Sequence, residues 1–265
     1  MRILAALHLH STYSYDAKLS LSELKQVLLA RGVTCALMTE HTDEMTEEKA
    51  KAYIAECAEL SDDSFLFIPG FEISYSSTHI LAPGCTTFLS QHATRDELIA
   101  WRTHAPLMVL AHPHRNGYRT DMIPDGILDG IEIWNAQYDG KVVPRNGARR
   151  MYARLARTTR NLGAFCGWDF HRASHAGGPV IALDVPERTH EAVIAALCAR
   201  TFTLRSSVVE VRADGALMSG DPRWVYVMSA GYVAFIRVGK VVNRVLAALG
   251  LKLPQGLVAQ VRKRV

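Results

Sequence analysis

Short apolar runs alternate along most of the chain with longer segments in which apolar residues recur every three to four positions. The short runs predict buried strands, and the longer periodic segments predict helices with one apolar face. Their alternation favours a parallel sheet covered by helices, and 265 residues suffice for one α/β barrel. We therefore expect an α/β fold with a closed or nearly closed barrel, whose strands cover residues 3–7, 35–39, 65–74, 79–82, 107–111, 127–134 and 163–167.

Residues that cap helices mark where the predicted helices begin and end. Ser20 or Ser22 precedes an apolar face that ends at Gly32, and Thr94 with Glu97 fits a capping box. Further helices are expected over residues 46–60, 143–161 and 189–200.

The C-terminal part of the chain follows a different pattern. Residues 206–221 predict a hairpin that turns at Asp214 and Gly215, and Asp221 followed by Pro222 is a good helix start. We therefore divide the chain into a barrel domain at 1–205, a hairpin at 206–221 and a basic amphipathic helical tail at 222–265.

The predicted tail helix has a basic and an apolar face. Arg237, Lys240 and Arg244 form the basic stripe, and the uncharged run 224–236 has 13 residues, fewer than the roughly 20 needed to span a bilayer. The helix is expected to pack against the barrel or a second subunit, or else to contact a membrane peripherally. Gly250 and Pro254 are expected to end it, and its apolar face is Val238, Val241, Val242, Val245, Leu246 and Leu249.

Composition places few limits on function. The apolar share of 49% and the charged share of 21% are ordinary for a globular protein. The five cysteines form no CxxC pair, and residues 1–7 are too short for the apolar core of a signal peptide. These features favour a reducing cytoplasm, with peripheral contact at the inner membrane face as a further possibility.

Charge is distributed unevenly along the chain. Residues 223–265 carry eight of the 30 Lys/Arg and none of the 26 Asp/Glu, which leaves residues 1–222 with a net charge of −4. The tail therefore presents a different surface from the body of the protein.

Histidines and carboxylates gather where the predicted strands end. His8 and His10 are two positions apart, so a strand directs both to one face, and Asp169 and His171 repeat the spacing. Because the C-terminal ends of barrel strands meet at one rim, such side chains can form a single metal site. The candidate metal ligands are His8, His10, Asp16, His41, Glu72, His79, His112, Asp169 and His171.

The order of seven short motifs resembles that of a known family, the polymerase and histidinol phosphatase (PHP) family of metallophosphoesterases. Over residues 2–205 the motifs are LHLHSTYSYD, TEHTD, PGFEIS, HILA, AHPHR, GIEIWN and GWDFH. The resemblance implies a distorted TIM-like (β/α)7 barrel with two or three divalent metal ions at its rim. It implies one metal held by His8, His10, Glu72 and Asp169, a second by Glu72, His79 and His112, and a third by Asp16, His41 and His171.

Three positions depart from the family pattern. Leu7 stands where the family often has Asp, Glu40 and Thr42 flank the strand-two histidine in place of two aspartates, and Trp168 stands where Ser is usual. None of these departures removes a proposed ligand. Trp168 is expected to narrow the pocket and so to restrict the size of the substrate.

The candidate ligands also indicate the chemistry of the site. Imidazole and carboxylate without thiolate suit Zn, Mn or Fe(II), and a metal-bound water of depressed pKa, present as hydroxide, is the expected nucleophile. Cations of this kind favour a phosphate ester as substrate. The residues expected to carry catalysis are His8, His10, Glu72, Asp169 and His171.

Other polar residues near the motifs receive weaker assignments. Arg115, Arg172 and His114 are candidate phosphate-binding residues, although each could instead be an ordinary rim residue. Glu132 is expected to support a ligand histidine rather than to bind metal itself. No catalytic role is expected for His92, His104, His175 or His190.

Taken together, the residues and the resemblance predict a metal-dependent phosphoesterase that acts on a small phosphomonoester or a nucleotide. A nuclease or oligonucleotide-end trimmer is the second hypothesis, which the negative body disfavours because a long polyanion needs a basic track. A metal-stabilised binding module without catalysis is the third.

Overall fold

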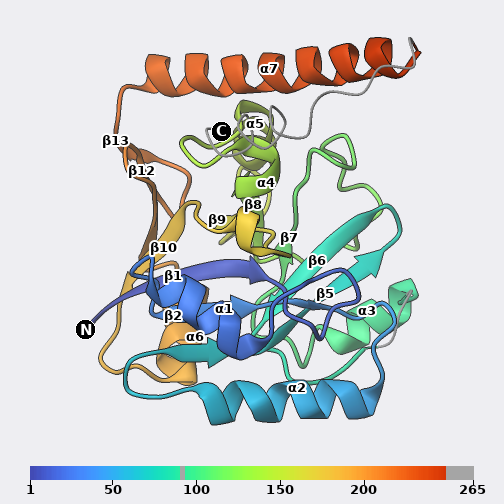
Figure 1. The fold of residues 1–265 in the computed structure, drawn as a ribbon, viewed down its shortest axis with the longest axis vertical. Helices are drawn as coiled ribbons and strands as arrows, with labels where there is room; N and C mark the ends of the chain where they lie inside the picture. The colour runs from blue at the N-terminus through green and yellow to red at the C-terminus, as the bar shows by residue number, and fades with distance from the viewer. Residues whose placement is uncertain (90–92, 249–265) are drawn as a thin grey trace.

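The structure, a computed structural model, describes residues 1–89 and 93–248 and contains two mixed β-sheets with helices around them (Figure 1). In sheet order, the first sheet contains β13 (Leu217–Ser219), β12 (Glu210–Arg212), β11 (Phe202–Arg205), β10 (Val180–Asp184), β1 (Arg2–Leu9), β2 (Cys35–Met38) and β4 (Leu66–Ile68). The second contains β3 (Glu40–His41), β5 (Gly70–Tyr75), β6 (Thr78–Pro83), β7 (Val109–Leu110), β8 (Gly130–Asn135) and β9 (Gly163–Gly167).

The expectation of an all-parallel sheet is wrong. Strands β1, β2 and β4 are parallel, as are β7, β8 and β9, but β6 runs antiparallel to β5 and β7, and β10 runs antiparallel to β1. A two-residue turn at Ser76 and Ser77 reverses the chain between β5 and β6, with Ser76 at a φ of 54°. The predicted strand 65–74 is in fact two strands of different sheets, β4 and β5, separated by Pro69.

The predicted closed barrel is not confirmed, because within the described residues neither sheet closes on itself. Strand β10, which the apolar pattern did not predict, pairs with residues 2–5 of β1 and so occupies the edge that β9 would need for closure. Only the end of β1 reaches the segment after β9, where Trp168 donates its N–H to Leu7 and Phe170 donates its N–H to His8. The two sheets therefore meet at this corner.

The helices follow the predicted caps closely. Ser20, rather than Ser22, caps the first helix in a capping box with Glu23, and Thr94 with Glu97 forms the second capping box. The helix predicted over 143–161 is shorter than expected. The helices are α1 (Leu21–Leu29), α2 (Glu47–Leu60), α3 (Arg95–Trp101), α4 (Ala136–Asp139), α5 (Asn146–Leu155), α6 (His190–Ala199) and α7 (Pro222–Ala248), with a 3₁₀ turn at Ala173–His175.

The C-terminal elements extend the first sheet and then leave it. β12 and β13 form an antiparallel pair joined through Asp214 and Gly215, and β12 also pairs with β11, so the hairpin is continuous with the sheet. Where the chain divides into domains stays a prediction. Helix α7 then lies along one end of the molecule, beside α4 and α5 and opposite α2 (Figure 1). Some predictions concern residues outside the described ranges. These are the helix stop at Gly250 and Pro254, the apolar Leu249, four basic tail residues and His92.

Helix α7 is the one helix in the described ranges that is long and apolar enough to cross a membrane, judged by length and composition alone. Its most apolar window has a mean hydropathy of 1.4, and only 11% of that window is buried. Val225 and Ser229 are the buried residues of the helix, and they face the rest of the protein.

Candidate metal centre

All nine predicted ligands converge on one site at the junction of the two sheets. Strand β6 begins beside the end of β5, because Ser74 pairs with His79, so an antiparallel strand still delivers a ligand to the same rim. The ligands come from β1 and the residue after it (His8, His10), the loop before α1 (Asp16), β3 (His41), β5 (Glu72), β6 (His79) and the segments after β7 and β9 (His112, Asp169, His171).

Glu72 is the centre of the cluster and is almost fully buried, with 1% of its surface exposed. Its Oε2 lies 3.0 Å from Nε2 of His8, 3.2 Å from Nε2 of His10 and 3.4 Å from Nδ1 of His41. Its Oε1 lies 2.6 Å from Nδ1 of His79 and 3.2 Å from Nε2 of His112. One carboxylate therefore faces five imidazoles, and each of its oxygens faces a different group of them.

Two further carboxylates complete the cluster. The Oδ1 atom of Asp169 lies 3.7 Å from Nε2 of His8 and 3.4 Å from Nδ1 of His171. Asp16 lies on the solvent side, with Oδ2 at 3.2 Å from Nε2 of His171 and Oδ1 at 3.8 Å from Nε2 of His41.

The backbone is strained where three of these residues sit. His8, His112 and Asp169 have φ values of 66°, 23° and 52°, in the left-handed region that residues with a side chain rarely adopt. A β-bulge interrupts the pairing of β1 with β2 between Leu7 and Leu9, and it re-aims His8 toward the cluster. Strain of this kind persists only where the surrounding structure fixes it, and it concentrates at functional sites.

Burial and mutual charge set the protonation of the cluster. Burial alone would raise the pKa of Glu72, but the imidazoles of His8 and His41 hold it well below its usual range. Burial would lower the pKa of His8, but Glu72 and Asp169 raise it well above its usual value. For His10, burial and the neighbouring His41 lower the pKa to about 3. The carboxylates are thus ionised, and the imidazole of His10 is neutral and able to bind a cation.

The residues fit a bound metal. Nε2 of His10, Nδ1 of His41 and Oδ1 of Asp16 are buried and have no hydrogen-bond partner within the described structure. A buried polar atom without a partner is costly, and a cation would satisfy all three. Four overlapping triads have their ligand atoms within 4.8 Å of one another, namely His8–His10–Glu72, His8–His112–Asp169, His41–Glu72–His79 and His10–His41–His171.

Comparison with solved structures gives the same fold. A two-domain protein from Bacteroides vulgatus, described as containing a PHP-like metal-dependent phosphoesterase, superposes with a TM-score of 0.57 at 16% identity, over 77% of this chain and 65% of that one. This chain has the PHP fold. The lesion-specific endonuclease PfuEndoQ from Pyrococcus furiosus shares it with a TM-score of 0.54 at 13% identity, over 80% of this chain and 59% of the endonuclease.

A third structure matches over nearly its whole length. PsfC from Pseudomonas syringae PB-5123 has a TM-score of 0.52 at 17% identity, over 89% of this chain and 99% of PsfC. By contrast, this chain spans less than two thirds of the Bacteroides protein and of the endonuclease. No protein-family model and no curated protein sequence matches the chain. The PHP resemblance inferred from the motifs is thus supported by the fold.

Two residues around the cluster hold its side chains in place. Oε1 of Glu132 lies 3.0 Å from Nδ1 of His8, and its Oε2 accepts the backbone N–H of His112 at 2.7 Å. Glu132 thus supports two residues of the cluster, whereas the sequence predicted support of one histidine. Asn135, which the sequence analysis missed, donates its amide to Glu132 at 2.9 Å and lies 3.4 Å from Asp169.

A second buried network, centred on Glu40, was also missed. Glu40 accepts the backbone N–H of Ser11 at 2.8 Å and the hydroxyls of Ser11 and Ser14. The Ser14 hydroxyl in turn lies 3.2 Å from Nδ1 of His10 and accepts the N–H of His41 at 2.9 Å. Burial raises the pKa of Glu40 to about 7. The departure of Glu40 from the family pattern was the available signal, but only the fold shows that Glu40 orders His10 and His41 through Ser14.

The cavity at the mouth of the cluster has a volume of about 430 Å³. Arg172 lines it, as expected for a phosphate-binding residue, and its Nε donates to Nε2 of His175 at 2.7 Å. His175 and Lys18 also line the cavity, although no role was predicted for either residue. The complete lining is Asp16, Lys18, Gln137, Tyr138, Asp169, His171, Arg172 and His175.

Three other predicted positions lie elsewhere. Arg115 stands 6.0 Å from the ring centre of Tyr138 and does not line this cavity, and His114 lines a separate one. Trp168 is buried and donates its indole N–H to the carbonyl of Pro179 at 2.8 Å, so it does not narrow the cavity as expected.

Proposed function

We propose that the protein is a metal-dependent phosphoesterase that hydrolyses a small phosphomonoester or a nucleotide. The observation that carries this proposal is the buried carboxylate of Glu72 with five imidazoles at 2.6–3.4 Å. The imidazole and carboxylate groups of this cluster are the ligand types that a transition-metal cation takes, and a site open to a cavity of about 430 Å³ leaves room for a small substrate.

Two or three divalent ions, Zn, Mn or Fe, are the proposed cofactors. Glu72 would bridge two of them, because its two oxygens face separate sets of imidazoles, and Asp16 with His171 and His41 would hold the outermost ion. Ions in this position polarise a phosphate ester and activate water for attack on phosphorus.

The chain's own residues would supply binding and orientation. The guanidinium of Arg172 and the ammonium of Lys18 both line the cavity and are suited to phosphate oxygens. Glu132 fixes the ring of His8 through Nδ1, and the Ser14 hydroxyl does the same for His10. Rigid ligands of this kind favour catalysis, because little reorganisation is needed when charge develops on the phosphoryl group.

The test is metal analysis of the purified full chain, followed by turnover of p-nitrophenyl phosphate, nucleotides and short oligonucleotides. We expect bound transition metal and hydrolysis of the small esters. Glu72→Ala and His10→Ala should abolish turnover and leave the fold largely intact. Near-normal turnover and metal content in Glu72→Ala would refute the bridging role.

The same panel separates the other hypotheses. Endonuclease Q has been solved with a 27-mer duplex substrate that carries an abasic lesion, so nuclease activity is a second candidate for this fold. Cleavage of oligonucleotides without turnover of small esters would establish it. Stoichiometric metal without turnover of any substrate would instead establish a metal-stabilised binding module.

We also propose that α7 binds the surface of an anionic membrane. Nine large apolar side chains of this helix are exposed, among them Val227 at 64% and Phe235 at 47%. Phe235, Val238, Val242 and Val245 among them recur every three to four residues. The basic residues Arg237, Lys240 and Arg244 follow a neighbouring stripe, and the helix has no acidic residue. Apolar residues beside basic ones are typical of helices that lie in the membrane interface.

The contacts of α7 with α5 determine how α7 is oriented on the protein. Asn146 of α5 bonds to Ser229 and Tyr226 of α7, so one side of the helix is held against the protein and only the other side is free. A helix that lies in the plane of the membrane fits this arrangement. A cytoplasmic location of the protein, at the inner face of the membrane, stays a prediction. A second copy of the chain is the alternative partner for the exposed face of α7, although the identical basic stripes of the two copies would repel each other.

Liposome flotation tests the membrane proposal. The full chain should bind vesicles that contain phosphatidylglycerol, and Phe235→Glu should abolish binding, because it places an acid in the apolar stripe. Val208→Glu is the matched control, since Val208 is 46% exposed but belongs to the loop between β11 and β12 and not to α7. Equal partitioning of all three proteins would exclude membrane binding by α7. A change in oligomeric state with Phe235→Glu would indicate that α7 instead packs against a second copy of the chain.

A further inference from the structure

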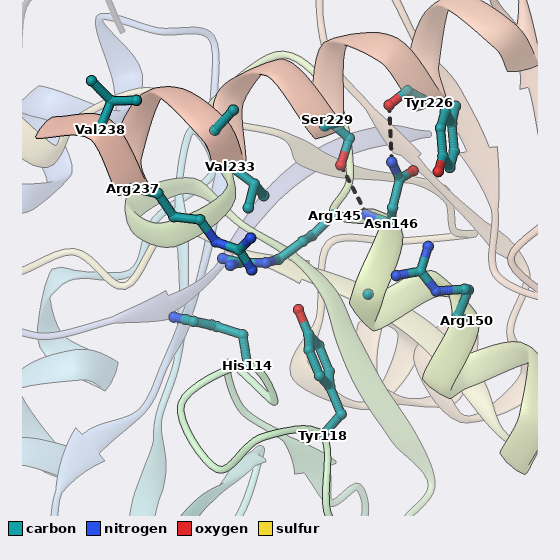
Figure 2. A pocket seen from close by; sticks show the side chains of 13 residues that line it. His114, Tyr118, Arg145, Asn146, Arg150, Tyr226, Ser229, Val233, Arg237 and Val238 are labelled. Carbon is teal, nitrogen blue, oxygen red and sulfur yellow. Dashed lines mark hydrogen bonds between the residues drawn. The ribbon is translucent and has the colours of Figure 1, made fainter. Parts of the chain in front are cut away.

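A second cavity, of about 640 Å³, lies between α7, the N-terminus of α5 and the loop after β7 (Figure 2). It is distinct from the cavity of the metal centre and has no lining residue in common with it. Its polar lining includes Arg145 and Arg150 at the start of α5, Arg237 on α7, and His114 and Tyr118 from the loop.

Most of the positive charge of this cavity is uncompensated. No Asp or Glu lines it, and of its three arginines only Arg145 has an acidic partner, Asp139 at 3.1 Å. Arg150 and Arg237 form no ion pair with any described residue, and the residues outside the described ranges contain no Asp or Glu that could supply one. Three guanidinium groups on one cavity repel one another unless an anion lies between them.

The backbone adds to the positive potential. Arg145 caps α5 without a side-chain hydrogen bond, and the N–H of Asn146 donates to the Ser229 hydroxyl. Within the described residues, the next two N–H groups of this ten-residue helix, those of Gly147 and Ala148, have no partner. A Cβ at Gly147 would lie 2.2 Å from the Tyr118 hydroxyl, so glycine is what lets that hydroxyl approach the helix start. An N–H donor array beside convergent arginines is suited to phosphate oxygens.

We propose that this cavity binds a phosphate group through Arg145, Arg150 and Arg237. Val233 and Val238 of α7 form an apolar wall, which indicates that the phosphate carries an apolar substituent. It belongs either to a soluble phosphate ester or to a phospholipid headgroup beside the exposed face of α7. Phosphate binding in this cavity does not depend on hydrolysis at the metal centre, because the two cavities are separate. The rings of His114 and Tyr138, 4.6 Å apart, stand between them.

Calorimetric titration of the full chain with inorganic phosphate tests the proposal, with chelator present so that the metal centre does not contribute. Arg150→Gln and Arg237→Gln should each weaken binding about tenfold, as the loss of a charged hydrogen bond does. Arg154→Gln on α5 and Arg223→Gln on α7 are matched controls, since both residues lie on the same helices but do not line the cavity. Both controls should bind phosphate as the parent chain does.

Equal affinity in all five proteins, or no phosphate binding at all, would overturn the proposal. Glu72→Gln separates it from the proposed hydrolysis, because this variant should lose turnover yet retain phosphate binding in the second cavity. The source of the phosphate is decided by competition. Displacement of bound phosphate by phosphatidylglycerol vesicles, and not by phosphatidylcholine vesicles, assigns the cavity to a lipid headgroup, and displacement by soluble methyl phosphate alone assigns it to a soluble ester.

Discussion

His8 and Glu132 are 124 residues apart in the chain, and Nδ1 of the first lies 3.0 Å from Oε1 of the second with both side chains fully buried. Glu132 orients the ring of His8 through Nδ1 and so directs its Nε2 toward Oε2 of Glu72, 3.0 Å away. The same carboxylate accepts the N–H of His112, so one residue sets the positions of two others in the cluster.

Glu132→Gln should therefore lower metal affinity and turnover by about 10–100-fold, the usual cost of losing a carboxylate behind a ligand histidine. Metal titration and kcat at saturating metal are the measurements. Glu191→Gln, at an exposed position on α6, is the control and should match the parent chain. Unchanged metal affinity in Glu132→Gln would show that the contact does not orient His8.

Ser14→Ala should disturb two ligands at once. Its hydroxyl bonds to Glu40, to the ring of His10 and to the N–H of His41, so its loss leaves buried groups unsatisfied at a cost of about 1–3 kcal/mol. Urea unfolding measures the loss of stability, and metal titration measures the weaker site. Ser77→Ala, in the exposed turn between β5 and β6, should change neither quantity.

Removal of metal should lower the melting temperature of the protein. A ligand that binds only the folded state stabilises it by about 2.7 kcal/mol at one hundred times its dissociation constant, so chelator should abolish that stabilisation. Thermal unfolding with chelator and with excess Mn or Zn provides the comparison. In Glu72→Ala the two curves should coincide, and coincident curves for the parent chain would argue against a metal centre.

Asp139 should make stability depend on pH in a defined direction. Burial raises the pKa of this carboxyl to about 7 in the folded state, against about 3.9 when unfolded. Because the folded state holds the proton more tightly, the contribution of Asp139 is greatest below about pH 4 and is lost as pH rises through about 7. The stability of the parent chain relative to Asp139→Asn should fall over this interval and be constant above it. A difference that does not vary with pH would contradict the raised pKa.

Two glycine substitutions should act in opposite directions. A Cβ at Gly70 would lie 2.5 Å from the carbonyl oxygen of Ala82 and 2.7 Å from that of Met38, so Gly70→Ala should destabilise the fold by about 1–3 kcal/mol. Gly231 lies on exposed α7 with no atom near its added Cβ, so Gly231→Ala should stabilise the helix by about 0.5–1 kcal/mol. Urea unfolding measures both, and similar stability in the two variants would contradict the close packing at Gly70.

The local pattern predicted most elements because it reports local physics. The capping boxes at Ser20 and Thr94 and the helix start at Pro222 depend on residues within one turn, so they could be inferred directly. The prediction of a single strand over 65–74 was wrong, because an apolar pattern does not distinguish one strand from two strands of different sheets. Strands β10 and β11 were missed, and β10 occupies the edge of β1 that β9 would need for closure.

The sequence by itself determined which side chains can form the cluster, because histidines and carboxylates at the C-terminal ends of parallel strands share one edge. His79 reaches that edge only because β6, which is antiparallel, begins there. Tertiary structure alone decided that Glu72 lies at the centre, that Glu132 and Glu40 hold the ligands, and that Arg145, Arg150 and Arg237 share one cavity. These contacts join residues far apart in the chain, and their distances depend on bulges, strand direction and the docking of α7, which no local pattern encodes.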